Sequence, residues 1–217
     1  NEAIRLDPTQ ADLYQMKAIA LMSLPALNEA EENAHLIEAQ NNLQIALKID
    51  PNDAKVYQNL AISYLLSKKL DAALKCYEKA LILAPKQDHS CLLKNLSLLY
   101  FELRDYEKAL LDCEQAIQLG CKDREIYLIR GHCLFETSQF EQAIQNYHLA
   151  IHAGYHDASV YFNRAKAYSC LHQLDKALED ATRVLETDPS HLECYKLRGL
   201  ILLSMHKDLE AYSDFCM

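Results

Sequence analysis

The chain has 217 residues, of which half are hydrophobic, with four glycines, five prolines and a formal net charge of −9. This excess of acidic side chains argues against nucleic-acid binding, because that affinity comes from neutralising phosphates with lysine and arginine. No apolar run approaches the roughly 20 residues that cross a bilayer, and the first residues lack the pattern of a signal peptide. We therefore expect a soluble, cytoplasmic chain without membrane contact.

A pattern of tyrosine and small residues recurs along the chain every 34 residues. Tyrosine marks equivalent points at Tyr127, Tyr161 and Tyr195. A small residue follows each tyrosine after four positions, and alanine follows after sixteen: Gly131, Ala165 and Gly199, then Ala143, Ala177 and Ala211. A fixed period of this length indicates one array of short units, each burying its apolar face against its neighbours. Leucine, alanine, glutamate and lysine are abundant, which favours helices throughout.

The first part of the chain departs from this period. Residues 1–10 look like the end of a truncated repeat, and the unit at 11–53 is nine residues longer than the others. Pro25 ends its first helix, and Asn28 followed by Glu31 has the spacing of a capping box, which predicts a second helix starting near Glu29 with two extra turns. The insertion at 24–38 is either a tolerated surface addition or a lip that contacts a partner.

The later units are regular. They span 54–87, 90–123, 124–157 and 158–191, and a truncated unit follows at 192–217. Within each unit, apolar residues at three- and four-residue steps form two blocks, as at 160–171 and 174–185, which predicts a helical hairpin. Because both ends of the chain fall inside units, we expect a fragment of a longer array.

Seven residues of one unit carry a resemblance to a known family. They are Tyr161, Arg164, Ala165, Tyr168, Ala177, Ala181 and Pro189. They stand where tetratricopeptide repeats place their large, small and proline residues. The resemblance implies an all-α fold, namely an α-solenoid in which antiparallel helix hairpins form a right-handed superhelix. It also implies a non-enzymatic scaffold for protein–protein interaction.

Catalytic and metal-binding patterns are missing from the sequence. It contains no glycine-rich phosphate loop, Gly-x-Ser-x-Gly or His-Glu-x-x-His, so we expect no catalytic residues and no cofactor. His148 and His152 could share a helix face, but zinc needs further ligands, so we expect no metal site. The eight cysteines form no Cys-x-x-Cys pair, and we expect them to be buried or half-buried in a reducing compartment.

The resemblance implies that the first helices of the hairpins line a concave groove. Asn59, Asn95 and Asn163 occupy equivalent positions there, and an amide can both donate to and accept from a peptide backbone. This is similar to the asparagine ladder of O-linked N-acetylglucosamine transferase, although Met16, Ile129 and Leu197 interrupt it. The expected partner-binding residues are Lys55, Gln58, Asn59, Ile62, Lys94, Asn95, Leu98, Phe101, Leu128, His132, Phe135, Phe162, Asn163 and Lys166.

Three functional hypotheses remain. The first is a scaffold whose groove binds a peptide segment or helix of a partner protein, and the second is the substrate-recruiting part of a larger enzyme with its catalytic domain outside this chain. The third is self-association. We do not expect binding of chaperone C-terminal tails, because Glu193 and Leu197 stand where the family's carboxylate clamp has lysine and arginine.

Overall fold

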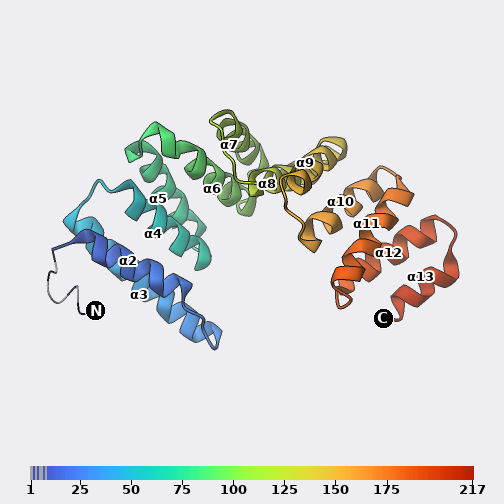
Figure 1. Cartoon of the computed structure of the whole chain (residues 1–217), viewed down its shortest axis with the longest axis horizontal. Coiled ribbons are helices and arrows are strands. Elements are labelled where there is room, and N and C mark those ends of the chain that lie inside the picture. Colours follow the sequence, from blue (N-terminus) through green and yellow to red (C-terminus); the bar gives the residue numbers. More distant parts are fainter. Residues whose placement is uncertain (1, 3, 5–6, 8) are drawn as a thin grey trace. The chain divides into compact units, whose positions relative to one another are not determined.

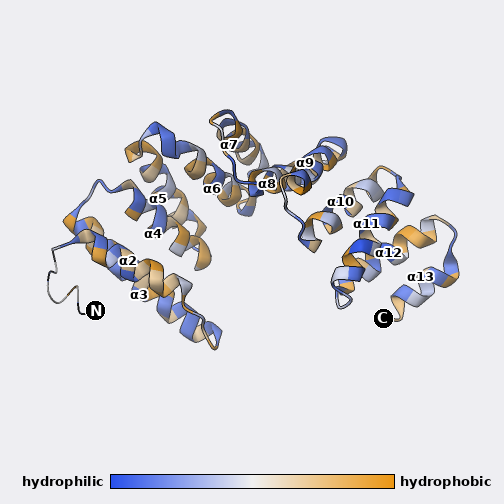
Figure 2. Cartoon of the chain, in the orientation of Figure 1, coloured by the Kyte–Doolittle hydropathy of each residue, from blue (hydrophilic) through white to orange (hydrophobic). Residues whose placement is uncertain are grey.

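The computed structural model describes residues 2, 4, 7 and 9–217, and its regular elements are all helical (Figure 1). They are α2 (Ala11–Ser23), α3 (Glu29–Ile49), α4 (Ala54–Leu66), α5 (Leu70–Leu83), the 3₁₀ turn η1 (Lys86–Asp88), α6 (His89–Glu102), α7 (Tyr106–Gln118), α8 (Glu125–Glu136), α9 (Phe140–His152), α10 (Ala158–Cys170), α11 (Leu174–Thr187), α12 (Leu192–Ser204) and α13 (Asp208–Phe215). The helix tail expected at residues 1–8 lies largely outside the described residues. Hydrophobic and hydrophilic residues alternate along the helices (Figure 2), as packing in layers requires.

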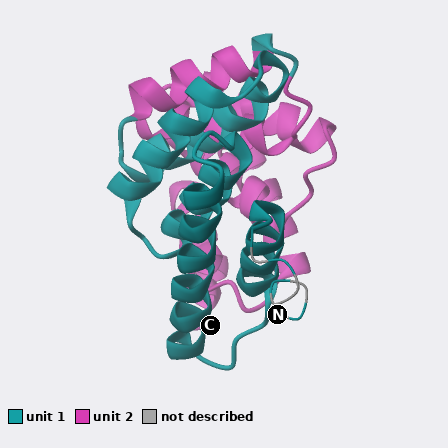
Figure 3. Cartoon of the chain, turned by 90° about the vertical axis from the view of Figure 1, so that its left-hand side faces the viewer, with its two compact units in different colours: residues 1–105, 118–120 teal, residues 106–117, 121–217 magenta. Residues whose placement is uncertain are grey.

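The chain divides into two compact units, and each is a stack of hairpins (Figure 3). The first comprises residues 1–105 and 118–120, and the second comprises 106–117 and 121–217. In the first unit, the hairpins α2/α3 and α4/α5 pack in series and α5 then contacts α6. In the second unit, α8/α9, α10/α11 and α12/α13 follow one another in the same way. This arrangement in series confirms the all-α solenoid of helix hairpins.

The small residues of the repeat lie where two helices of a hairpin approach closely. Ala61, Ala165 and Ala177 are completely buried. At Gly131, an added Cβ would lie only 2.6 Å from the Tyr147 ring. A larger side chain at these positions would therefore overpack the hairpin, which accounts for the period seen in the sequence.

The hairpin turns share a backbone conformation that the residue types at these positions do not predict. Lys68, Arg104, Ser138, His172 and His206 all have φ between 53° and 61°. In the α10–α11 turn, the Gln173 N–H donates to the Tyr168 carbonyl at 2.9 Å and the His172 N–H donates to Ser169 at 3.0 Å. This is the geometry of a Schellman motif, in which glycine is the usual left-handed residue. Here each such position carries a side chain.

Replacing His172 by glycine is expected to raise the free energy of unfolding by about 0.5–1 kcal/mol, because a left-handed conformation costs a non-glycine residue about 1–2 kcal/mol. His172 is exposed, so few packing contacts are lost. The matched control is Ser169→Gly, which lies in right-handed α10 and should lower stability by about 0.5 kcal/mol. Thermal unfolding followed by circular dichroism measures both. A lower melting temperature for His172→Gly would contradict the expectation.

The long second helix of the first hairpin begins where the sequence predicts. α3 has 21 residues, whereas α5 and α11 have 14. Asn28 Oδ1 accepts a hydrogen bond from the Glu31 N–H at 2.9 Å, and Glu31 Oε2 accepts from the Leu27 N–H at 2.8 Å. The predicted start at Glu29 is confirmed. The Glu31 carboxylate, however, reaches the residue before the cap rather than the cap itself.

The cysteines fit the expectation only in part. No disulfide links any of the eight, all of which lie in the described part of the chain. Cys113, Cys133 and Cys194 are buried, and Cys113 fills the position that Tyr77 and Tyr147 occupy in other repeats. The expectation is wrong for the three exposed thiols, Cys91, Cys170 and Cys216, which lie near helix ends.

None of the helices within the described residues is both long enough and apolar enough to cross a membrane.

Candidate functional site

The residues predicted to contact a partner lie on the first helices of successive hairpins. α4 carries Lys55, Gln58, Asn59 and Ile62; α6 carries Lys94, Asn95, Leu98 and Phe101; α8 carries Leu128, His132 and Phe135; α10 carries Phe162, Asn163 and Lys166. Their spacing of three and four places the members of each helix on one face. Because α4 and α6 belong to the first unit and α8 and α10 to the second, they form two sets.

In the second unit, a lysine is held between two phenylalanine rings. Lys166 Nζ lies 4.7 Å from the centroid of Phe135 and 5.8 Å from that of Phe162. Each such contact attracts the cation to the ring face, by about 0.5–1 kcal/mol at an exposed site. The structure thus brings together three predicted residues from α8 and α10 as a cation on an apolar platform.

Beside this platform, an asparagine amide is oriented by a neutral histidine. Asn163 Nδ2 donates to the Ser159 carbonyl at 2.9 Å and lies 3.1 Å from His132 Nε2. Burial, with a smaller contribution from the Lys166 charge, lowers the pKa of His132 to about 4. The ring is therefore neutral at physiological pH, and its Nε2 can accept the second amide hydrogen.

This geometry corrects the expected role of Asn163. The sequence predicts an amide that both donates to and accepts from a partner backbone. In the structure both amide hydrogens point to groups of the chain itself. The carbonyl oxygen Oδ1 is the group left to accept an N–H from a partner.

Leu128 does not belong to the contact surface. Its exposed fraction is 7%, and it packs in a core cluster with Val160 and Tyr161. The position directly after the marker tyrosine faces inward on α8, because this helix packs against both α9 and α10. The prediction of Leu128 as a partner-binding residue is therefore wrong.

In the first unit, the predicted residues lie on α4 and α6. Gln58 Nε2 lies 3.9 Å from Cys91 Sγ, which links α4 to α6. Asn59 and Asn95 are half-buried, whereas Lys55 is exposed. Ile62 packs against the buried leucines of α6. The two asparagines keep equivalent places on the first helices α4 and α6.

His191 is a neighbour of the second set that was not among the predicted residues. The His191 ring lies against Phe162, with 4.8 Å between the centroids. His191 Nδ1 also accepts from the Cys194 N–H at 3.2 Å at the start of α12. The side chain therefore extends the aromatic surface from α10 towards α12. Its place before the first residue of a helix is the signal that could have revealed it.

Arg164 takes part in the fold rather than in the contact surface. Its guanidinium donates to both carboxylate oxygens of Asp180, at 2.7 and 2.6 Å, and lies near the faces of Tyr161 and Tyr168. The side chains of the pair are only 12% and 5% exposed. The Arg164 guanidinium is therefore engaged within the hairpin of α10 and α11.

His148, one of the two histidines considered as metal ligands, is also engaged. His148 Nε2 lies 3.0 Å from the Tyr168 hydroxyl, and its Nδ1 lies 3.1 Å from Arg164 Nη1. His156 Nδ1 lies 3.2 Å from the Tyr161 hydroxyl. Across the part of the chain that the structure describes, no three His, Cys, Asp or Glu side chains gather in an arrangement that could hold a metal ion.

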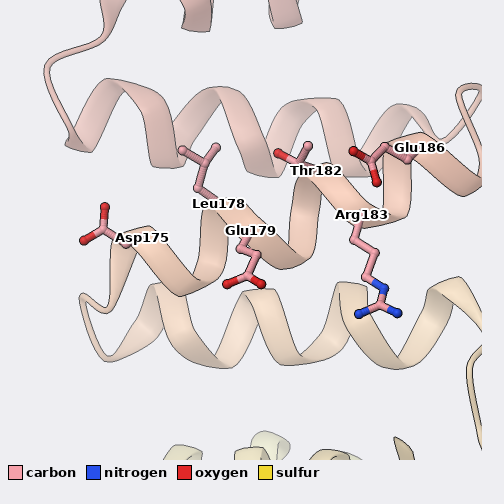
Figure 4. A pocket seen from close by; sticks show the side chains of 6 residues that line it. All are labelled: Asp175, Leu178, Glu179, Thr182, Arg183 and Glu186. Atoms are coloured by element: carbon pink, nitrogen blue, oxygen red, sulfur yellow. The ribbon is translucent and has the colours of Figure 1, made fainter.

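A hollow on α11 was not predicted by the sequence (Figure 4). It has a volume of about 610 Å³, and six side chains of this helix line it: Asp175, Leu178, Glu179, Thr182, Arg183 and Glu186. Arg183 lies over the Tyr161 ring at 4.4 Å. Because one helix supplies the whole lining, these carboxylates do not converge on a common point from opposite walls, as acid–base chemistry requires.

Models of the tetratricopeptide repeat match three stretches of the sequence, residues 54–87, 93–122 and 158–191. None of the curated proteins matches the sequence significantly.

Solved structures share the fold at low sequence identity. A chain of the APC/C hetero-tetramer Cut9–Hcn1 is 17% identical with a TM-score of 0.78, over 99% of this chain and 40% of that one. PilF of Pseudomonas aeruginosa is 18% identical with a TM-score of 0.77, over 96% and 89% of the two chains. YrrB, described as a TPR protein with an unusual peptide-binding site, is 22% identical with a TM-score of 0.67, over 89% and 94%. The chain thus spans about 40% of the length of the Cut9–Hcn1 chain that it matches.

Proposed function

Because this chain belongs to the tetratricopeptide repeat family, we propose that it is a non-enzymatic scaffold that binds an extended segment or helix of a partner protein on its first helices. The observation that carries the proposal is the surface formed by Phe135, Phe162, Asn163 and Lys166 in the second unit. It combines an apolar platform, a cation and an oriented hydrogen-bond acceptor. These are the features that fix a peptide in place.

Each part of this surface has a distinct task in binding. Asn163 Oδ1 accepts an N–H from the partner backbone, whatever the side chain of that residue. The Lys166 ammonium donates to a carbonyl or carboxylate oxygen of the partner. The two phenylalanine rings cover an apolar side chain and exclude water from both polar contacts, which strengthens them. YrrB, a structural neighbour described as having a peptide-binding site, supports this kind of use.

The local charge of the surface specifies the partner further. The predicted contact residues include Lys55, Lys94 and Lys166 but no aspartate or glutamate, although the chain as a whole carries a net charge of −9. In the second unit, an acidic side chain of a partner segment would therefore pair with Lys166, beside Phe135 and Phe162. Such complementarity selects the partner and its orientation more than it adds affinity.

The experiment compares two paired variants, one for each unit. Asn59→Ala with Asn95→Ala alters the first, and Phe135→Ala with Lys166→Ala alters the second. Proteins captured by each variant are quantified by mass spectrometry against the unaltered chain, and the affinity of a purified partner is then measured by calorimetry. We expect at least one pair to weaken binding tenfold or more, about 1.4 kcal/mol, as loss of a central contact does.

The control carries Asp175→Ala with Glu179→Ala, both exposed on α11. It should capture the same proteins as the unaltered chain. Because Phe135 also packs against the core, Lys166→Ala is measured alone as well, and circular dichroism checks that each variant is folded. Full capture by both paired variants would show that the partner binds elsewhere.

A further inference from the structure

The insertion in the first hairpin borders a cavity that contains none of the predicted contact residues. It has a volume of about 280 Å³ and lies between the end of α2, the α2–α3 connection, the first turns of α3 and the end of α4. Its outer wall is the extension formed by the α2–α3 connection and the first turns of α3. The second helices α5 and α11 are shorter and lack this extension. We call this cavity the insertion pocket.

The wall of the insertion pocket is apolar and open to solvent. Met22 and Leu36 form its inner part, and Leu24 and Leu66 form its rim with exposed fractions of 52% and 51%. Figure 2 colours much of the α2–α3 connection as hydrophobic. The volume lies just below the roughly 300 Å³ at which pockets for drug-sized ligands begin, so it suits a large apolar side chain of a protein.

One polar atom inside the wall lacks a partner. His35 Nδ1 is buried and has no hydrogen bond within the described part of the chain. A buried polar atom without a partner is costly, and most such atoms in folded proteins are paired. An occupant that brings a hydrogen-bonding group beside its apolar side chain, as any peptide backbone does, would remove this cost.

The charge around the pocket identifies the kind of partner. Glu32 lines the pocket, and Glu29 and Glu31 lie in the same first turn of α3. The sequence contains no lysine or arginine between Lys17 and Lys48, whereas on the α4 side Lys68 and Lys69 follow Leu66, and Lys69 Nζ lies 3.4 Å from Gln40 Oε1. The rim is thus acidic on the side of the first turn of α3, which disfavours phosphate groups of nucleic acids or anionic lipids there and favours a basic segment beside Glu32.

We infer that the insertion pocket binds a basic protein segment, which places one bulky apolar side chain against Leu24 and Leu66 and pairs a neighbouring lysine or arginine with Glu32. The site contains none of the predicted contact residues and lies at the ends of α2 and α4, next to the insertion. It gives the insertion the role of a partner-binding lip.

The test uses the small number of methionines in the chain. There are four, Met16, Met22, Met205 and Met217, and only Met22 lines the pocket. Their ¹³C-labelled methyl groups are observed by NMR during titration with a short peptide of leucine and lysine. Two matched peptides replace lysine by glutamate or leucine by serine. The leucine–lysine peptide should shift the Met22 signal saturably, without shifting Met205 or Met217.

Two variants locate the interaction without removing core residues. Ala26→Phe fills the pocket from the α2–α3 connection and should abolish the Met22 shift, whereas Glu32→Lys should weaken binding on the order of fivefold. Leu209→Ser, at an exposed leucine of α13, is the control and should bind normally. An unshifted Met22 signal, an equal response to the glutamate peptide, or full binding by Ala26→Phe would each overturn the inference.

Discussion

Replacing Arg164 by alanine is expected to lower the free energy of unfolding by about 3–5 kcal/mol, the usual effect of breaking a buried ion pair. The Asp180 carboxylate, 5% exposed in its side chain, would keep its charge and lose both guanidinium hydrogen bonds. The planar contacts with Tyr161 and Tyr168 would be lost as well. Urea unfolding followed by circular dichroism measures the change.

The chain supplies a matched control at the equivalent position of the preceding repeat. Arg130 corresponds to Arg164, but the position equivalent to Asp180 is the neutral Asn146. Arg130→Ala therefore leaves no buried carboxylate without its partner. It should lower the free energy of unfolding by less than about 1 kcal/mol. Replacing both partners, Arg164→Met with Asp180→Leu, should recover much of the stability. Equal losses for Arg164→Ala and Arg130→Ala would contradict this explanation.

The same pair recurs one repeat later, and this recurrence was visible in the sequence. Arg198 donates to both oxygens of Asp214 at 2.8 and 2.7 Å, sixteen residues apart, as in the pair formed by Arg164 and Asp180. In the sequence, Arg164 was one of the residues that carry the family resemblance, and no partner was assigned to it. A comparison of the second helices at the same period would have found its partner.

An earlier repeat has the aspartate of this pair but not the arginine. Asp112 occupies the position of Asp180, while the position of Arg164 is taken by Leu96. Asp112 Oδ2 is buried without a hydrogen bond among the described residues, and desolvation raises the pKa of this carboxyl to about 6. The period predicts where such residues lie, but their charge state depends on burial, which the sequence alone does not show.

The fold was predictable because the small residues at its close helix contacts recur with a fixed period. Buried alanines and the Gly131 position recur at fixed intervals, since each hairpin repeats the same close helix contact. The left-handed turns at Ser138 and His172 were not predictable from residue type, because neither is glycine. Packing of the hairpin imposes that conformation on whichever residue stands there.

The candidate site was predictable only to the level of the helix face. Period and family resemblance place Asn163 and Lys166 on the first helix, and the structure has them there. The direction of each polar group depends on neighbours from other repeats. His132, 31 residues away, takes one amide hydrogen of Asn163, and the packing of α8 buries Leu128. Contacts of this kind are not visible in a single sequence.

Acidification is expected to destabilise the second unit through His132. The folded chain holds the pKa of His132 at about 4, below the ordinary value of 6.5, because the ring is buried and Lys166 lies nearby. Between these two values the unfolded chain binds the proton and the folded chain does not. Stability from this residue is thus complete above pH 6.5 and falls as the pH drops towards 4, by up to about 3 kcal/mol.

The substitution that tests this is His132→Gln, which keeps an acceptor for Asn163 but cannot titrate. Unfolding in urea between pH 7 and pH 4, the range set by these pKa values, should show a smaller loss of stability for this variant than for the unaltered chain. Asp112→Asn is the comparison with the opposite sign: because the folded pKa of Asp112 is raised to about 6, this variant should gain stability at neutral pH and little near pH 4. Parallel pH profiles for the unaltered chain and His132→Gln would show that His132 is not the titrating group. The pKa of His132 matters for binding too, since a protonated His132 can no longer accept from Asn163 and would repel Lys166. Because the folded chain takes up this proton only near pH 4, the contact surface should weaken there, below most of the range over which the fold loses stability.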